Sequence, residues 1–265
     1  MSEATNVFTD GEVYERLMGR WSRLVGKAFL DWLDIPKGSH WLDVGCGNGA
    51  FTEEIISRTA PAAVVAIDPS MEQIAYAAKR AGTEIAKFQL GDAQMLPFDN
   101  DKFDVAVMAL VISFLTDPAK AVAEMVRVVR PGGCVAAYMW DLPGGGVPTS
   151  PIYRAMRSMG ITPASVPNPL ASELEALKEI WVTAGLESVS LEVIRITVTY
   201  SDFDDFWNSN SVPGGPQGKV IHSMPAAARE QLRTRLRQQL PIRADGSIAY
   251  ESVANAVKGR VPMRS

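Results

Sequence analysis

The sequence contains few residues of the kinds that build disulfide frameworks and metal sites. Only two cysteines and two histidines occur among its 265 residues. Cys46 and Cys134 both lie in apolar surroundings, and neither belongs to a Cys-x-x-Cys pair. This scarcity argues against a disulfide-stabilised domain and a structural zinc site, and it fits a reducing compartment. We therefore expect a protein without a metal centre.

Basic charge and long apolar runs are also scarce. The formal net charge is −4 at pH 7, which argues against nucleic acid as a partner because phosphate binding needs a basic surface. The longest apolar stretch, from Val105 to Leu115, is too short to span a bilayer. Residues 1–15 are polar and acidic and lack the apolar segment of a signal peptide. We expect a cytoplasmic protein with no membrane span.

The most informative stretch is a glycine-rich turn within HWLDVGCGNGAF, residues 40–51. An apolar run that contains Asp43 leads into Gly45, Gly47 and Gly49, and a helix-compatible segment follows directly. Glycine tolerates positive φ and has no Cβ, so a strand–glycine turn–helix unit lets a ligand approach the backbone closely. The turn therefore predicts a ligand site of the nucleotide type.

Apolar segments alternate with helical patterns after this turn. Strands are predicted at 63–67, 84–90, 103–110 and 134–140, with helices that begin near residues 71 and 117. Such alternation predicts an α/β fold with a mostly parallel sheet and a ligand at the carboxyl ends of its strands. Asp68 and Asp92 each follow one of these strands, at the predicted ligand edge.

The composition changes from Leu142 onward, where Gly/Pro-rich loops begin. Two more strands are predicted at 188–200 and 248–261, and the excursion between them is too long for a simple turn. We interpret it as a cap over the ligand edge. The predicted organisation is an amino-terminal helical lid at 1–38, a core at 39–200 and 245–265, and a helical cap inserted at 201–244.

The acids narrow the choice of ligand. Asp68 ends the second strand, where a carboxylate can accept both ribose hydroxyls, so NAD and S-adenosylmethionine (SAM) both fit at this point. Asp43, just before the turn, would repel a pyrophosphate but attract an ammonium group. Asp92 can accept a hydrogen bond from an adenine amine. No Tyr-x-x-x-Lys pair of a short-chain dehydrogenase is found.

Four ordered motifs resemble those of the class I SAM-dependent methyltransferases, in particular the small-molecule group typified by the ubiquinone and menaquinone C-methyltransferases. The motifs are DVGCGNG at 43–49, IDPSM at 67–71, GDA at 91–93 and RPGG at 130–133. The resemblance covers roughly residues 40–140. It implies a Rossmann-like, seven-stranded, mostly parallel sheet with helices on both faces and an antiparallel last strand. Amino-terminal helices and the inserted cap complete the predicted fold.

The resemblance also implies roles for individual residues around SAM and its product S-adenosylhomocysteine. The glycines would line the methionine portion above Asp43, Asp68 would hold the ribose, and Met71 would pack on the adenine. Arg20 would pair with the carboxylate of SAM, and Ala109 would lie near its amino group. The full predicted set is Tyr14, Arg20, Asp43, Gly45, Gly47, Asn48, Gly49, Asp68, Pro69, Met71, Asp92, Ala93, Gln94 and Ala109.

The acceptor site is less well specified by the sequence. Methyl transfer is an in-line displacement that depends mainly on proximity, and it needs a base only when the acceptor must lose a proton. His222 is the candidate base, and a structural histidine is the alternative reading. The predicted pocket wall consists of Tyr138, Trp140, Phe203, Phe206 and Trp207. No Asn-Pro-Pro-Tyr segment follows the fourth strand, which disfavours amino methylation of adenine or glutamine.

The predicted function is therefore methyl transfer from SAM to a small-molecule acceptor, with O-, N- and C-methylation all open. Two alternatives remain at this point. One is an NAD(P)-dependent oxidoreductase on a similar sheet, and the other is a SAM-binding protein without transfer activity.

Overall fold

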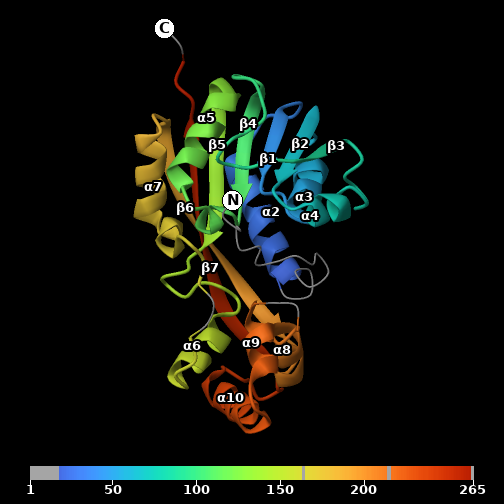
Figure 1. Ribbon diagram of the computed structural model, residues 1–265, viewed down its shortest axis with the longest axis vertical. Coiled ribbons are helices and arrows are strands. Elements are labelled where there is room, and N and C mark those ends of the chain that lie inside the picture. Colours follow the sequence, from blue (N-terminus) through green and yellow to red (C-terminus); the bar gives the residue numbers. More distant parts are fainter. Residues whose placement is uncertain (1–17, 163–164, 214–215, 264–265) are drawn as a thin grey trace.

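The computed structural model describes residues 18–162, 165–213 and 216–263. The chain forms a sheet-based core and a smaller helical lobe (Figure 1). In chain order the elements are α2 (Arg20–Leu33), β1 (His40–Val44), α3 (Ala50–Thr59), β2 (Ala63–Asp68), α4 (Met71–Ala77), β3 (Ala86–Leu90), β4 (Phe103–Ala109), the short 3₁₀ turn η2 (Ile112–Phe114), α5 (Pro118–Val128), β5 (Val129–Trp140), α6 (Ser150–Ser158), the 3₁₀ turn η3 (Pro169–Ser172), α7 (Leu174–Thr183), β6 (Glu187–Tyr200), α8 (Phe203–Asn210), α9 (Pro216–Ser223), α10 (Ala226–Gln239) and β7 (Ile248–Arg260).

The strands form one seven-stranded sheet in the order β3-β2-β1-β4-β5-β7-β6. The pairs β1–β2, β1–β4, β2–β3 and β4–β5 are parallel, whereas β7 runs antiparallel to both of its neighbours. The carboxyl ends of the first five strands consequently meet at one edge, as the right-handed crossovers require. The predicted fold, including the antiparallel last strand, is confirmed.

Helices cover both faces of the sheet, which explains why its central strands are apolar throughout. Alternate side chains of a strand point to opposite faces, so Trp41 joins Phe29 of α2 and Ile55 of α3 in one buried cluster. Leu42 joins Met125 of α5 in the other. Asp43 has the same parity as Trp41 and therefore faces α3.

Strands β6 and β7 continue past the end of the sheet. Strand β5 ends at Trp140, opposite Ala254, but β6 and β7 stay paired as far as Tyr200 opposite Ile248. Beyond Trp140 they form a two-stranded ribbon, visible in Figure 1 as the connection to the lower helices. We call α6, α8, α9 and α10 at its end the distal lobe.

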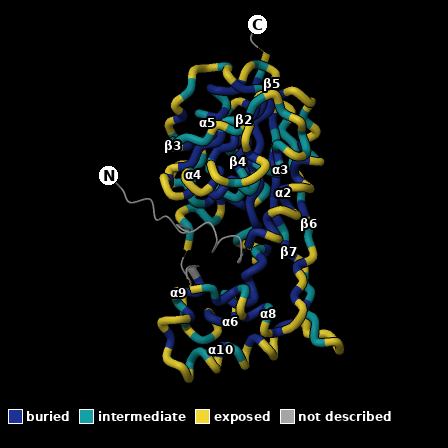
Figure 2. The backbone as a smooth tube through the Cα atoms, turned by 90° about the vertical axis from the view of Figure 1, so that its right-hand side faces the viewer, coloured by how far each residue is buried: buried dark blue, intermediate teal, exposed yellow. Residues whose placement is uncertain are grey.

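The distal lobe contains more than the predicted cap. Helices α8 to α10 fall within the predicted range 201–244, but α6 packs against α10 and belongs to the same lobe. Arg235 Nη1 donates to Ser158 Oγ at 3.0 Å, and the Tyr153 hydroxyl donates to Gln217 Oε1 at 3.3 Å. Figure 2 shows buried residues on the helices of this lobe, and they belong to the same hydrophobic cluster as Phe29 and Trp41 of the core.

Helix α2 is the described part of the predicted amino-terminal lid, because residues 1–17 lie outside the described ranges. It packs along α3, β6 and β7. Lys258 Nζ of β7 donates to the Trp32 carbonyl at 2.7 Å near its end. Among the helices that the structure describes, none is both long and apolar enough to cross a membrane.

Candidate functional site

A cavity of about 380 Å³ opens at the carboxyl edge of the sheet. Its wall is built from the glycine turn after β1, the ends of β2, β3 and β4, the segment around η2, and parts of α2 and α3. Three of the four sequence motifs therefore meet at one site, although they lie far apart along the chain. The fourth, at 130–133, begins β5 at the opposite end of the sheet and does not line the cavity. This is the ligand edge expected for an open α/β sheet.

The glycine turn is shaped by backbone geometry. Gly45, Gly47 and Gly49 all have positive φ, at 78°, 52° and 79°. The Gly45 and Cys46 amides both donate to the Ile67 carbonyl, at 2.8 and 2.9 Å, which ties the turn to the end of β2. A Cβ at Gly45 would lie 2.5 Å from a methyl group of Val111. Glycine is thus required here both by conformation and by space.

Asp68 lies at the cavity wall and is already oriented by the backbone. Its Oδ2 accepts from the Gly47 amide and its Oδ1 from the Ser70 amide, both at 2.9 Å. Burial raises the pKa of Asp68, while these two hydrogen bonds act in the opposite direction. Each carboxylate oxygen can accept more than one hydrogen bond, so both remain able to accept hydroxyl groups of a ligand.

Asp43 lies beneath the turn and does not line the cavity. It is 0% exposed, and its Oδ2 accepts from the Thr52 hydroxyl at 2.6 Å. Its Oδ1 has no hydrogen-bond partner among the described residues. Burial raises the pKa of Asp43 to about 7, and the negative charge of Asp68 adds to this effect, whereas the bond from Thr52 lowers it.

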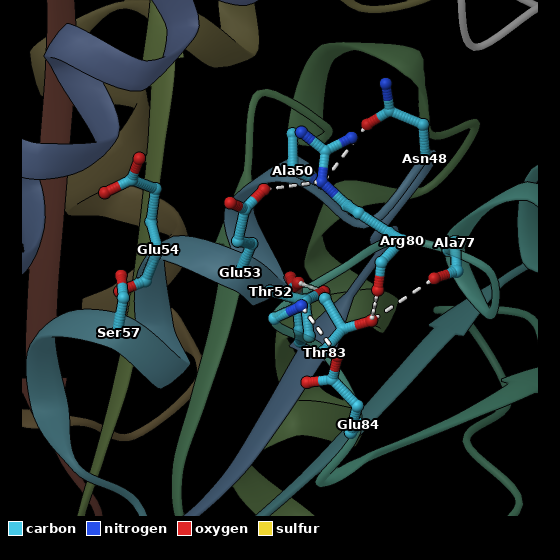
Figure 3. A network of polar contacts seen from close by, with 12 residues as sticks. Asn48, Ala50, Thr52, Glu53, Glu54, Ser57, Ala77, Arg80, Thr83 and Glu84 are labelled. Atoms are coloured by element: carbon cyan, nitrogen blue, oxygen red, sulfur yellow. Dashed lines mark hydrogen bonds and ion pairs between the residues drawn. The ribbon is translucent and has the colours of Figure 1, made fainter.

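Contacts between polar side chains hold the glycine turn and the start of α3 in place. Figure 3 shows the Arg80 guanidinium between the carboxylate of Glu53 and the side chain of Asn48. Arg80 Nε lies 2.6 Å from Glu53 Oε2. Asn48 lines the cavity, and its Oδ1 accepts from the Ala50 amide at 3.1 Å. The first turn of α3 is thus held against the segment that follows α4.

The segments after β3 and β4 form the opposite wall. Asp92, Ala93 and Gln94 line the cavity, as does Ala109. Asp92 Oδ1 accepts from the Gln94 amide at 2.8 Å. The Gln94 side-chain oxygen accepts from the Thr116 hydroxyl and the backbone amide of Asp117, each at 2.9 Å. This network fixes the loop that closes the wall beside Asp92.

Several residues predicted to contact SAM do not line this cavity. Met71 is 66% exposed on the surface, whereas Pro69 and Gln73 line the wall near it. Gly49 precedes α3 as its N-cap. The Arg20 guanidinium stacks over the rings of Trp21 at 4.2 Å and Tyr200 at 4.6 Å, so the prediction that it reaches the cofactor receives no support from its placement.

Tyr14 lies outside the described residues. Residue Arg23, one helical turn after Arg20, lines the cavity instead.

The predicted acceptor wall is divided between two places. Tyr138 lines the cavity, with its ring 4.7 Å from that of Phe29 and 5.6 Å from that of Phe51, measured between centroids. Trp140 is buried two residues further along β5.

Phe203, Phe206 and Trp207 are buried on α8 in the distal lobe and do not line the cavity. His222, on α9, is 2.9 Å from the Ser211 carbonyl through Nε2 and also lies away from the cavity.

The cavity wall also includes four residues that no motif in the sequence indicated: Arg23, Glu54, Leu110 and Val111. Glu54 follows Ala50 by one helical turn, so helical spacing is a signal that would have placed it on the same face. Leu110 has a φ of 60°, which is uncommon for a non-glycine residue. No pattern in the sequence indicates that conformation.

Comparisons with known proteins agree with this geometry. A family model described as "Methyltransferase domain" matches residues 42–137. A ubiquinone/menaquinone biosynthesis C-methyltransferase of Dinoroseobacter shibae is 33% identical over 134 residues, which cover 49% of this chain and 54% of that protein. A demethylmenaquinone methyltransferase of Renibacterium salmoninarum is 31% identical over 163 residues, or 60% of this chain and 65% of that protein. The matched stretch spans less than two-thirds of either relative.

A solved structure shares the fold at lower sequence identity. Phosphoethanolamine N-methyltransferase 2 of Haemonchus contortus, in complex with S-adenosyl-L-methionine, aligns with a TM-score of 0.61 and 19% identity. The alignment covers 98% of this chain and 58% of that one. Together with the glycine turn and the sheet order, the domain match at 42–137 supports a class I SAM-dependent methyltransferase.

Proposed function

We propose that this chain transfers a methyl group from SAM to a small-molecule acceptor. The observation that carries the proposal is the buried Asp43 carboxylate beneath the glycine turn, with Oδ1 unpartnered within the described residues. Burial holds its pKa near 7, so a cationic ligand above the turn would favour its ionised form. A dianionic pyrophosphate at the same place would instead favour the protonated form and gain no attraction from it, so a cation fits this position better than a dinucleotide does.

The remaining wall residues fit the other parts of SAM. Asp68 offers both carboxylate oxygens to a ribose, and Asp92 offers an acceptor for an adenine amine. A Cβ at Gly47 would meet nothing within 4 Å, so the turn leaves open space beside its backbone. These features support SAM as the cosubstrate.

The proposed reaction requires the protein mainly to position SAM and the acceptor. When bound, SAM would supply a methyl group on its sulfonium: the acceptor nucleophile would form a bond to the methyl carbon as the carbon–sulfur bond breaks and S-adenosylhomocysteine leaves. The chain would contribute by holding the nucleoside through Asp68 and Asp92 and by fixing the acceptor side with the Tyr138 ring. His222 lies outside the cavity, so we assign no general base to it.

We infer that the acceptor binds between the cavity and the distal lobe. The β6–β7 ribbon runs toward the same side as the carboxyl ends of β1 to β5, and it places the lobe beyond that edge (Figure 1). One relative is named as a ubiquinone/menaquinone biosynthesis C-methyltransferase and another as a demethylmenaquinone methyltransferase, which supports a small, partly apolar acceptor.

Titration calorimetry with SAM and S-adenosylhomocysteine tests the proposal. Asp68→Asn is expected to weaken S-adenosylhomocysteine about 100-fold, because a ligand loses two hydrogen bonds to a charged group. Asp99→Asn removes an equal charge from an exposed position that does not line the cavity, and it should bind as the wild type does. Absence of wild-type binding, or quenching of tryptophan fluorescence by NADH alone, would contradict the proposal.

A second measurement tests transfer itself. Methyl-labelled SAM is incubated with a panel of phenols, amines and carbon acids, and the label is followed into small molecules. Transfer to any of them supports the proposal. Tight SAM binding without transfer across the panel would favour a SAM-binding protein.

A further inference from the structure

The proposed function assigns no role to two charged side chains of the cavity wall. Arg23 comes from α2 and Glu54 from α3, and the other charged residues of the wall are Asp68 and Asp92 at the strand ends. Arg23 and Glu54 carry opposite charges. They therefore provide one positive and one negative charge, whereas the strand ends provide only negative charges.

The packing of α2 on α3 places these two side chains in the same wall. Ala50, Phe51 and Glu54 all line the cavity, as residues on one helical face do. Helix α2 approaches closely at Gly26, where a Cβ would lie 3.0 Å from the Phe51 ring. Because the helices are this close, Arg23 of α2 reaches the same part of the wall as Glu54.

The Glu54 side chain is partly buried and lies close to arginines. Its side chain is 22% exposed, and Arg58 Nε lies 3.5 Å from its Oε2. Burial and the neighbouring charge of Glu53 raise the pKa of Glu54, while the charges of Arg23 and Arg80 lower it. Figure 3 shows that Glu53 and Glu54 point in different directions from α3, with Glu53 facing Arg80. Glu54 is thus the acid of this helix that faces the cavity.

We propose that Arg23 and Glu54 bind the amino-acid end of the ligand, with Arg23 taking the carboxylate and Glu54 the ammonium group. The proposal rests on the proposed function, because SAM and S-adenosylhomocysteine carry both groups on one carbon. The two helices in the wall offer one charge of each sign for them, whereas the other charged wall residues, Asp68 and Asp92, are both acidic. Arg20, the carboxylate partner implied by resemblance, is stacked on Trp21 and Tyr200 outside the cavity.

The proposal predicts that affinity depends on the two charged groups of the ligand's amino-acid end and not only on its nucleoside. S-adenosylhomocysteine has both charged groups, whereas 5′-methylthioadenosine keeps the adenine, ribose and sulfur but lacks both. A variant that removes one charge from the wall should therefore affect the first ligand and spare the second. This difference separates recognition of the amino-acid end from a general loss of cavity shape.

Titration calorimetry with these two ligands tests the proposal on the wild type, Glu54→Gln and Arg23→Gln. Each substitution should weaken S-adenosylhomocysteine about tenfold, the size of one charge-assisted hydrogen bond. Binding of 5′-methylthioadenosine should stay within about twofold of wild type. Matched controls are Glu72→Gln on α4 and Lys27→Gln on α2, both exposed and outside the cavity wall, and both should leave the two affinities unchanged.

The outcomes distinguish this proposal from the proposed function. Unchanged S-adenosylhomocysteine affinity in both variants overturns it, as does an equal loss for both ligands. A loss in Arg20→Gln with none in Arg23→Gln would assign the carboxylate to Arg20 and overturn the role of Arg23. If the wild type binds neither ligand, the proposed function itself fails.

Discussion

The ligand edge of the sheet and the distal lobe are held together in different ways. At the ligand edge, backbone geometry does most of the positioning: positive φ angles at Gly45, Gly47 and Gly49, and amide bonds to Asp68. In the distal lobe, long side chains join the helices. The Arg237 guanidinium lies 3.9 Å from the Phe203 ring, and Arg237 also pairs with Asp204 at 3.7 Å.

This difference has a consequence for tolerance to substitution. A position fixed by φ and by contact with backbone accepts few residues, whereas a stack of an arginine on a ring can be replaced by many other contacts. We expect substitutions in the glycine turn to cost stability or binding sharply, and substitutions of the half-exposed arginines that join the distal-lobe helices to cost little.

Gly45→Ala should show the largest effect. An alanine there would be strained at a φ of 78°, and its Cβ would come within 2.5 Å of Val111. Together these predict a loss of about 4 kcal/mol in the free energy of unfolding, measured by urea denaturation. Gly160→Ala in the distal lobe has a φ of 74° and nothing within 4 Å of the new Cβ, so it should lose only about 1 kcal/mol. Equal losses would remove the contrast between the two regions.

Asp43→Asn should change how stability depends on pH. The pKa of Asp43 is raised to about 7 in the folded chain, against about 4 for an unfolded aspartate. Between these values the folded state binds more protons than the unfolded state, so ionisation of Asp43 lowers the free energy of unfolding as pH rises. The contribution between pH 5 and pH 8 is about 3 kcal/mol.

The asparagine variant lacks this titration. Urea denaturation at pH 5 and pH 8 should show that Asp43→Asn gains stability relative to the wild type at the higher pH. Asp99→Asn, which alters an exposed acid, should keep the wild-type profile. Parallel profiles for the wild type and Asp43→Asn would mean that Asp43 ionises with an ordinary pKa.

Arg237→Ala should have the smallest effect. It removes the stack on Phe203 and one ion pair with Asp204, which predicts a loss of about 1 kcal/mol in the free energy of unfolding. Calorimetry should find S-adenosylhomocysteine binding unchanged. Arg229→Ala on the same helix, outside this stack, serves as the control. Weakened ligand binding in Arg237→Ala would show that the two regions are coupled.

The same contrast explains what could be predicted from the sequence. Glycine at a turn and an acid after a strand have local physical causes, so Gly45, Asp68 and Asp92 could be placed in the wall before the fold was known. The alternation of strands and helices was sufficient for the sheet. In each case, neighbouring residues in the chain carry the information.

Features that depend on packing between distant segments could not be predicted in this way. Whether Arg20 or Arg23 faces the cavity depends on the rotation of α2 against α3, which is set by contacts between the two helices, such as that of Gly26 with Phe51. The association of α6 with α10 depends on contacts such as Arg235 with Ser158, which join residues far apart in sequence. Phe203 and Trp207 were predicted for the pocket wall, but they are buried inside the lobe and do not line the cavity.

The ribbon of β6 and β7 has a consequence for how such a chain can evolve. The lobe is joined to the core through this ribbon and the loops on either side of α6. Insertions, deletions or replacement of its helices can therefore accumulate without shifting the residues around Gly45 and Asp68. Selection for a new acceptor could act on one part of the polypeptide while the nucleoside site is inherited unchanged.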